Sequence, residues 1–419
     1  MFFLHLRPSS VVATCRLAGI TAVALALVTA HAQAQTALTL DEALRLAQQR
    51  SRQLPAQDAA AAAARDMSVA AGQRPDPVIK GGLINVPVTG PERFSLTKDF
   101  MTMRSIGVMQ EFTREDKRQA RAARFEREAD LAQAGWLTAL AELQRDTAMA
   151  WLELHYRLRM DDMTQGLRRE AELQIEAADA AYRGGRGSQA DVFAARSAVA
   201  TIDDRLRQMA REIATARVRL ARWVGDSAAQ GLGATPDMTL PPLDLAVLES
   251  TLENHPRIAW LARKEGLARA EVDAAKSEKS SDWSAELMYS QRGPEFSNMV
   301  SVSVSIPLQW NAGNRQDREL AAKLALAQRE RDEREEALRE VTALTRSAIL
   351  TWRSERERLA HYDTRLLPLA AERVHAALAA YRGASGPLSA VLEARRMEID
   401  TRLERLRIEM DAAGLWAQL

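Results

Sequence analysis

The sequence contains one glycine-rich corner twice. The segment AYRGGRGSQADVFAAR, at 181–196, returns as AYRGASGPLSAVLEAR at 380–395, and the shared residues keep one offset of 199 positions. In both segments the glycines of a turn separate two stretches that are rich in helix-forming residues. A segment that recurs at a fixed offset predicts a duplicated structural unit, so the fold must be built from two similar halves.

The two halves have the same predicted order of elements. We expect a first repeat at 35–225, a connector at 226–243 and a second repeat at 244–419. Each repeat begins with a helix, 40–73 in the first copy, and continues with a β-hairpin and a long helical hairpin. The β-hairpins are predicted at about 77–112 and 282–310, and the tips of the helical hairpins at about 184–188 and 383–387.

The β-hairpins are predicted from a strict alternation of side chains. From Val300 to Ile306 the sequence reads VSVSVSI, which places valine on one side of a strand and serine on the other. No amphipathic helix has this period. Because one side consists of hydroxyl groups, neither face resembles the closely packed core of a sandwich.

Helices of unusual length follow the two β-hairpins, at about 114–182 and 314–381. The first carries an apolar stripe from Trp136 to Leu158 with steps of three and four residues, which is typical of a coiled-coil seam. About 70 residues of helix extend for roughly 100 Å. We expect local adjustments of helix geometry at Gly135, Gly166 and Pro368.

The first 34 residues have the features of a secretory signal peptide. Two arginines precede a 13-residue apolar run, and Ala32-Gln33-Ala34 resembles a cleavage site. A membrane anchor is the alternative, but it needs about 20 apolar residues. Cys15 is the only cysteine and lies inside this segment, so the mature chain is expected to contain no disulfide, thiolate metal site or catalytic cysteine.

Composition and motifs exclude several function classes. Because 57 basic side chains nearly balance 56 acidic ones and no basic stripe stands out, we expect no nucleic-acid partner. No phosphate-binding loop, serine–histidine–aspartate spacing or metal-binding box is present, and we therefore predict no enzyme activity, no catalytic residue, no cofactor and no metal site. A periplasmic adaptor and a structural coiled-coil protein remain alternatives, although neither accounts for two hairpins together with the Val-Ser strand.

Four strands of this kind indicate an outer-membrane β-barrel. Each strand has about ten residues, the length that crosses a bilayer when tilted. Every backbone amide in lipid must be paired, so an open four-stranded sheet cannot span a membrane, and four strands are too few to close. The chain must therefore share a barrel with copies of itself, with eight strands in a dimer or twelve in a trimer.

The sequence resembles the TolC-type outer-membrane efflux proteins over essentially the whole mature chain. The resemblance is carried by the duplicated order of elements, by LTLDEALRLAQQRS at 38–51 and by the Tyr-x-x-Gly turns. It implies a mainly α-helical homotrimer in which a 12-stranded membrane β-barrel continues into a periplasmic α-helical barrel. It also implies an outer-membrane location, a periplasmic adaptor and an inner-membrane resistance-nodulation-division pump as partners, and outer-membrane lipid around the barrel.

In that family the two turns form the periplasmic tip, where the adaptor docks. The residues that the resemblance assigns to this tip are Tyr182, Gly184, Gly187, Asp191, Tyr381, Gly383 and Gly386. Family members often have an acidic residue where this chain has Ala390, which makes Glu393 the candidate for an acidic ring at the aperture. Such a ring would concentrate cations in a narrow mouth.

The cargo is less constrained by the sequence. The resemblance is closest to the heavy-metal branch of the family, with channels for drugs or for type I protein secretion as alternatives. Met101, Met103 and Met109 could bind Cu(I) or Ag(I) through sulfur. The offset of 199 matches them to Val300, Val302 and Leu308, however, so we expect these methionines to lie on the apolar, lipid-facing side.

Overall fold

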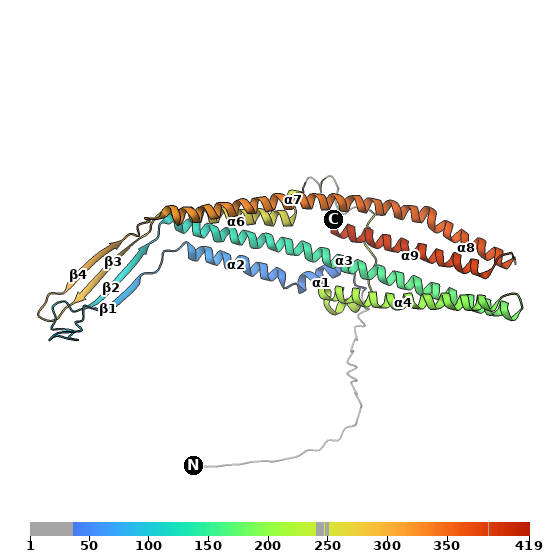
Figure 1. Ribbon diagram of the computed structural model, residues 1–419, viewed down its shortest axis with the longest axis horizontal. Coiled ribbons are helices and arrows are strands. Elements are labelled where there is room, and N and C mark those ends of the chain that lie inside the picture. The colour runs from blue at the N-terminus through green and yellow to red at the C-terminus, as the bar shows by residue number, and fades with distance from the viewer. Residues whose placement is uncertain (1–36, 240–246, 248–250, 384) are drawn as a thin grey trace, which may run out of the picture.

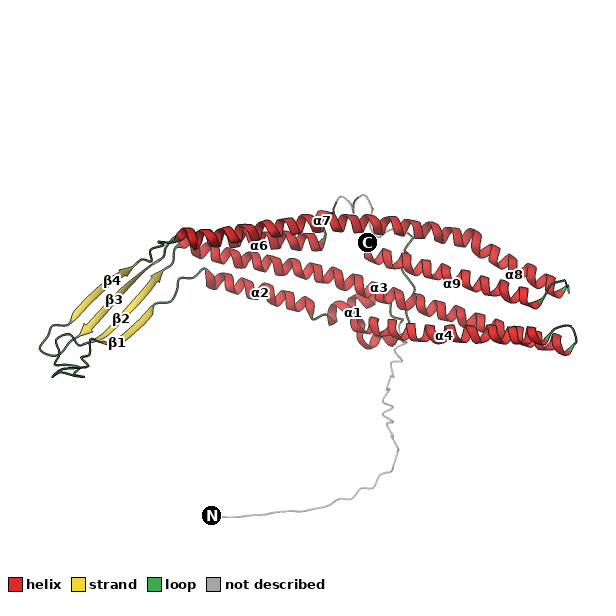
Figure 2. Cartoon of the chain, viewed as in Figure 1, coloured by secondary structure: helices red, strands yellow, loops and turns green. Residues whose placement is uncertain are grey.

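The computed structural model describes residues 37–239, 247, 251–383 and 385–419. The predicted signal peptide lies outside these residues, as does the expected start of the second repeat at 244. Figure 1 shows an elongated molecule with the four strands at one end and two helical hairpin tips at the other. The expectation of a mainly helical chain with a small antiparallel sheet is confirmed, and Figure 2 shows the strands confined to that one end.

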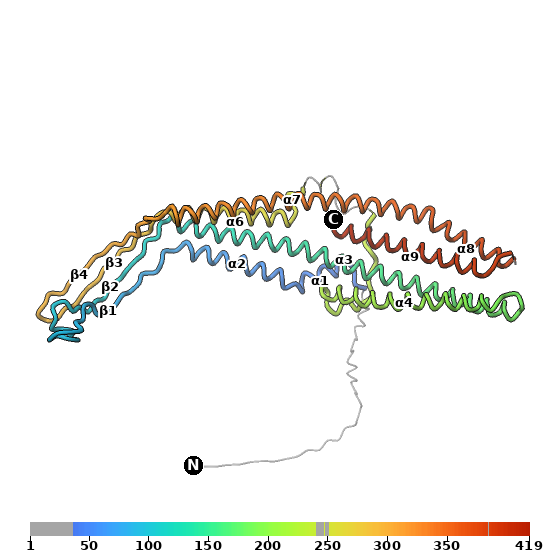
Figure 3. The backbone as a smooth tube through the Cα atoms, viewed as in Figure 1, coloured from blue at the N-terminus to red at the C-terminus, as the bar shows by residue number. Residues whose placement is uncertain are grey.

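The first repeat contains four helices and two strands. These are α1 (Leu40–Arg50), α2 (Gln53–Ala71), β1 (Val78–Ile84), β2 (Met103–Phe112), α3 (Glu115–Arg183) and α4 (Gln189–Val224), followed by the short 3₁₀ helix η1 (Gly225–Ala229). Figure 3 shows the chain running along α3 to the tip and returning along α4. Helix α3 is continuous through Gly135 and Gly166, so the expected adjustments at these glycines are absent.

The single helix expected at 40–73 is wrong, because α1 ends before Ser51 and α2 begins at Gln53. Pro55 explains the break. A proline in a continuous helix would clash with the carbonyl four residues earlier, at position 51, whereas the first turn of a new helix tolerates it. The Ser51 hydroxyl accepts the amide hydrogen of Leu54 and so stabilises the new helix start.

The second repeat follows the same order with more interruptions. Its elements are η2 (Leu252–Asn254), α6 (Pro256–Ser277), β3 (Trp283–Gln291), β4 (Met299–Ser305), η3 (Ala312–Asn314), α7 (Gln316–His361), η4 (Tyr362–Leu366), α8 (Leu367–Arg382) and α9 (Leu388–Gln418). The helix expected at 314–381 is therefore two helices joined by the π-helical turn η4. Pro368, at the start of α8, accounts for the change, because proline cannot donate the backbone hydrogen bond of a regular turn.

The four strands form one antiparallel sheet in the order β1-β2-β3-β4. The central pair, β2 and β3, joins the two repeats, and Phe112 stacks on Trp283 there with 4.1 Å between ring centroids. One row of directly paired residues crosses all four strands: Ile79, Val108, Leu287 and Val302. β1 and β4 each pair on one side only, so the sheet within one chain is open at both edges.

The largest apolar core lies midway along the helices, away from the sheet. Trp151, Leu154 and Leu220 are fully buried there, and helices α1, α3, α4 and α9 contribute to it. The indole N–H of Trp151 donates to the carbonyl of Leu38 over 2.9 Å. This hydrogen bond joins the segment just before α1 to the apolar stripe of α3. Among the described residues, no helix combines the length and the apolar character needed to cross a membrane.

Candidate functional site

The two predicted tips have the same turn geometry. In the first, the amides of Gly184 and Gly187 donate to the carbonyls of Ala180 and Ala181 over 3.0 and 3.1 Å. In the second, the amides of Gly383 and Gly386 donate to the equivalent carbonyls over 2.9 and 3.1 Å. The repeat detected in the sequence is thus also a repeat of hydrogen bonds.

Close approach of the backbone accounts for one glycine in each turn. A Cβ atom at Gly187 would lie 3.2 Å from the Cβ of Ala181, and one at Gly386 would lie 3.1 Å from the Cβ of Ala380. These contacts are tighter than most side chains allow. Gly185, which the sequence reasoning missed, has a φ of 70° and occupies the left-handed region that favours glycine.

The tips differ at the helix that follows the turn. Ser188 and Asp191 form a capping box at the start of α4: the Ser188 hydroxyl accepts from the Asp191 amide, and the Asp191 carboxylate accepts from the Ser188 amide over 3.0 Å. These hydrogen bonds from the Ser188 hydroxyl and amide hold the pKa of Asp191 below its usual range. In the second tip, Pro387 provides no side-chain cap and Ala390 replaces the aspartate.

An apolar cluster joins the two helical hairpins just behind the tips. The first hairpin contributes Ala178, Val192 and Ala195, and the second contributes Leu388 and Val391. Tyr381 packs against this cluster and is partly buried. Tyr182 occupies the equivalent position of the first hairpin but is 47% exposed. Equivalent tyrosines of the two repeats therefore differ: Tyr381 packs between the hairpins, and Tyr182 is exposed.

The candidate ring residue Glu393 is exposed on α9, near the second tip. It makes no hydrogen bond or ion pair with the other described residues. Its carboxylate is thus not used to hold the fold of the single chain, in contrast to Asp191.

The two faces of the sheet have different chemistry. Paired residues of neighbouring strands lie on the same face, and each strand alternates between the two. One face is mainly apolar, with Arg104 and Gln291 at one end, and has exposed apolar side chains on every strand: Ile79, Leu83, Ile106, Val108, Leu287, Tyr289, Val300, Val302 and Val304. The opposite face carries serines of β2, β3 and β4 together with an ion pair of 2.7 Å between Lys80 and Glu286.

The expected position of Met103 and Met109 is wrong. Met109 pairs directly with Glu286, which pairs with Ser303, so these methionines lie on the hydroxyl face rather than with the valines. In β2 and in β4 the apolar face carries the even-numbered residues, so an odd offset of 199 matches residues that lie on opposite faces. Met101 precedes β2 and belongs to neither face.

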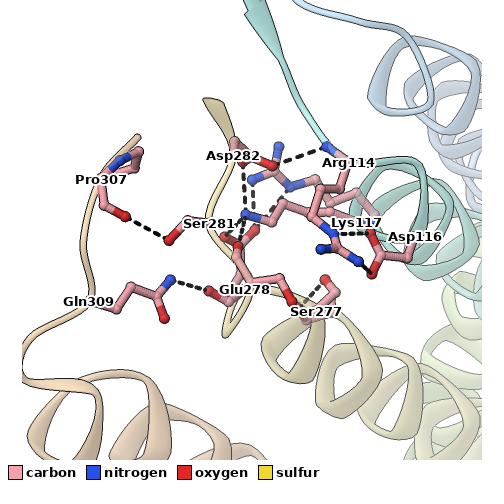
Figure 4. A network of polar contacts seen from close by, with 12 residues as sticks. Arg114, Asp116, Lys117, Ser277, Glu278, Ser281, Asp282, Pro307 and Gln309 are labelled. Atoms are coloured by element: carbon pink, nitrogen blue, oxygen red, sulfur yellow. Dashed lines mark hydrogen bonds and ion pairs between the residues drawn. The ribbon is translucent and has the colours of Figure 1, made fainter. Parts of the chain in front are cut away.

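A buried lysine joins the sheet to the helices. Lys117, which is 3% exposed at the start of α3, donates to the carboxylate of Asp282 over 2.8 Å and to the carbonyl of Ser280 over 3.0 Å. It also forms an ion pair of 3.1 Å with Glu278, and the other Asp282 oxygen accepts from the Arg114 amide (Figure 4). This network links the first repeat to the second where their strands begin and end.

Burial alone would raise the pKa of Asp282. The hydrogen bonds from Lys117 and from the Arg114 amide outweigh this effect, and the pKa of Asp282 therefore lies below its usual range. In the described part of the chain, no group of three or more histidine, cysteine, aspartate or glutamate side chains could hold a metal ion.

Solved structures resemble this architecture over nearly its full length. The outer-membrane channel OprN has a TM-score of 0.76 and 17% identity, with 90% of this chain and 88% of that chain covered. The outer membrane protein VceC of Vibrio cholerae has a TM-score of 0.70 and 16% identity, covering 90% and 96%. The CmeC outer membrane channel of Campylobacter jejuni has a TM-score of 0.70 and 12% identity, covering 90% and 84%.

The chain has the fold of these outer-membrane channels. No family model and no curated protein matches the sequence. Six solved structures with this fold are named as outer-membrane channels or as membrane proteins. Within the channel fold, the open sheet and the two hairpin tips form opposite ends of the molecule (Figure 1).

Proposed function

We propose that this protein is the outer-membrane channel of a tripartite efflux system, a TolC-type passive conduit that extends from the outer membrane into the periplasm. One observation carries the proposal. A sheet with an exposed apolar face and two open edges continues into helices whose tips lie at the far end of the molecule. An apolar face of this size is stable in lipid but would promote aggregation in water.

The open edges support a homotrimer. Unpaired backbone groups in lipid cost several kcal/mol each, so β1 of one copy must pair with β4 of the next. Two copies would give eight strands and three would give twelve. We favour three, because side chains just fill the interior of an eight-stranded barrel, whereas a twelve-stranded barrel is wider.

The hairpin tips are the proposed docking site for a periplasmic adaptor, which would connect the channel to an inner-membrane resistance-nodulation-division pump. Support comes from the exposed turn around Gly184 and the exposed Tyr182 beside it. In a trimer the two tips of each chain would alternate around the mouth and provide six contact positions of two types.

For the cargo we propose heavy-metal cations, which the sequence resemblance suggests. Drugs and secreted proteins are the alternative cargoes of the same fold. A deletion strain exposed to a panel of metals and drugs distinguishes them: sensitivity to metal cations alone supports the proposal, and sensitivity to drugs alone contradicts this choice of cargo.

Cysteine cross-linking tests the channel itself, because Cys15, in the predicted signal peptide, is the only cysteine of the sequence. We would place one cysteine at Ile79, Gly81 or Leu83 and a second at Val300, Val302 or Val304, all on the apolar face. Within one chain these two edges lie about 14 Å apart, three strand spacings. A shorter bifunctional maleimide should therefore link different copies and give a covalent trimer in outer-membrane vesicles.

A matched control places the cysteines at Val108 and Leu287, which pair directly within one chain and should cross-link without forming oligomers. A periplasmic monomer that shows only this internal cross-link would disprove the proposal.

The tips are tested separately with Gly184→Trp and Gly383→Trp. Loss of adaptor cross-links with an intact trimer supports the docking assignment. Unchanged export and unchanged adaptor cross-links in both variants would show that the tips have another role.

A further inference from the structure

The methionines of the sheet all lie on its hydroxyl face. Met103 and Met109 belong to β2, Met288 to β3 and Met299 to β4, and the strand register assigns each of them to the side of the serines. In β2, β3 and β4 every aliphatic or aromatic side chain lies on the opposite face, from Ile106 to Val304. On these three strands the thioethers are the only apolar side chains of that face, and in β1 Val78 and Ile84 share the face by pairing with Met109 and Met103.

Three of these side chains form a diagonal row. Met109 of β2 pairs with Glu286 of β3, and Met288 lies two residues after Glu286 on that strand. Met288 in turn pairs with Ser301 of β4, and Met299 lies two residues before Ser301. Met109, Met288 and Met299 are thus diagonal neighbours on successive strands, with Cα atoms about 7–8 Å apart. Each methionine has three rotatable bonds, which lets neighbouring sulfur atoms approach one another.

The row is closely packed on its β2 side, where Gly107 is buried. Gly107 pairs directly with Met288, and a Cβ atom at this glycine would lie 3.2 Å from the Met288 Cα and 2.8 Å from the Leu287 carbonyl oxygen. A larger residue there would push against the backbone of β3 and against Met288. The glycine therefore lets β2 and β3 lie close together beside the row, in which Met109 and Met288 are partly buried and Met299 is exposed.

Thioether sulfur is a soft ligand that selects Cu(I) and Ag(I) over hard cations. Neither ion requires a carboxylate cluster, and the described residues offer no such cluster of acidic, histidine or cysteine side chains. Lys80 and Glu286 on this face form an ion pair with each other, and Glu111, two residues after Met109, lies on the same face, so the charges beside the row do not repel a cation.

We propose that Met109, Met288 and Met299 form a binding row for soft monovalent metal ions, Cu(I) or Ag(I), on the inner wall of the barrel. This inference rests on the proposed function, because the hydroxyl face lies inside a channel only if the protein forms the proposed barrel. It identifies a chemical class of cargo and a place on the exit path where that cargo is held.

The test uses full-length protein purified as the assembled channel, with silver nitrate as the probe in chloride-free buffer. Mild peroxide oxidises accessible methionines to the sulfoxide, and peptide mass spectrometry measures the rate at each residue. We expect Ag(I) to slow the oxidation of Met109 and Met288 at least tenfold. Met67, an exposed methionine of α2, should react at the same rate with and without silver.

Calorimetric titration with silver nitrate gives a second measure. The double variant Met109→Leu/Met288→Leu keeps side-chain volume and apolar character, so the sheet should fold normally. We expect it to bind Ag(I) at least tenfold more weakly than the unmodified protein, whereas Met67→Leu should bind as the unmodified protein does.

Equal protection of all methionines, or equal silver affinity in the double variant, would overturn the proposal. Conductance in planar lipid bilayers separates this outcome from failure of the proposed function. A conducting trimer that does not bind silver disproves only the sulfur row, whereas a monomer without conductance disproves the channel.

Discussion

Tyr381 packs against the apolar cluster that both hairpins share, whereas its equivalent Tyr182 is 47% exposed. The second hairpin therefore contacts the first through the side that carries Tyr381, whereas the equivalent side of the first hairpin, which carries Tyr182, is exposed. If copies close into a ring, Tyr182 comes to face the second hairpin of the next copy. Tyr381 would then hold the two hairpins of one chain together, and Tyr182 would hold hairpins of neighbouring chains together.

Replacement of each tyrosine by alanine should separate these two roles. Tyr381→Ala removes a partly buried ring and should destabilise the packing of the tips by about 2 kcal/mol in any state of assembly. Tyr182→Ala should leave the monomer unchanged and increase amide exchange near the tips only in the assembled protein. Hydrogen exchange with mass spectrometry measures both. Equal effects in the monomer would show that Tyr182 has no separate partner.

The capping box predicts that the first tip loses stability at acidic pH and that the second tip does not. The pKa of Asp191 is lowered in the fold, so its contribution is present above about pH 4, the usual value for aspartate, and is lost as the pH falls through the lower folded pKa. Ser188→Ala should cost about 1 kcal/mol in the first helix start.

The second tip supplies the control for this experiment. Ala390 occupies the position of Asp191, and no side chain caps the start of α9, so the protection of amides around Gly386, relative to an unfolded peptide at the same pH, should not change with the same acidification. An equal acid response of both tips would contradict a role for the Asp191 carboxylate.

Local patterns in the sequence predicted most of the secondary structure. The Val-Ser alternation predicts a strand whatever the rest of the fold is. The three- and four-residue steps around Trp151 predict a buried helical seam in the same way. The glycine turns were also predictable, because Gly187 and Gly386 are needed wherever two helices approach so closely.

Features that depend on register or on distant partners were not predictable in this way. The face of Met109 depends on which residue of β3 it pairs with, and a shift by one position reverses the answer. The partner of Lys117 lies 165 positions away along the chain, and a lysine in the first turn of a helix normally suggests an exposed residue. The capping role of Asp191 was visible in the sequence Ser-x-x-Asp, but the family resemblance directed attention to docking instead.

Lys117 should be the most sensitive charged residue at the junction of sheet and helices. Lys117→Met removes the buried cation that the partly buried Asp282 and the neighbouring Glu278 share, which should destabilise the fold by about 3 kcal/mol. Chemical unfolding measures the loss, and Lys323→Met, which removes a more exposed ion pair with Glu271, serves as the control with a cost under about 1 kcal/mol.

The same junction should lose stability in acid. The pKa of Asp282 is lowered by the fold, so its stabilising contribution is complete above about pH 4 and disappears as the pH falls through the lower folded value. Asp282→Asn should remove this part of the pH dependence. An unchanged acid transition in that variant would assign the effect to other carboxylates.

Glu393 should influence which ions enter the proposed channel rather than how the chain folds. Its carboxylate is exposed and forms no ion pair with the described residues, so Glu393→Gln should leave unfolding transitions unchanged. In a trimer, three such charges in a narrow mouth would attract cations, and their removal should lower the cation preference of single-channel currents several-fold at low salt. Glu372 is an exposed glutamate of α8 that lies farther from the tip. Glu372→Gln is therefore the matched control and should leave that preference unchanged. If both variants conduct alike, the charge at position 393 lies away from the ion path.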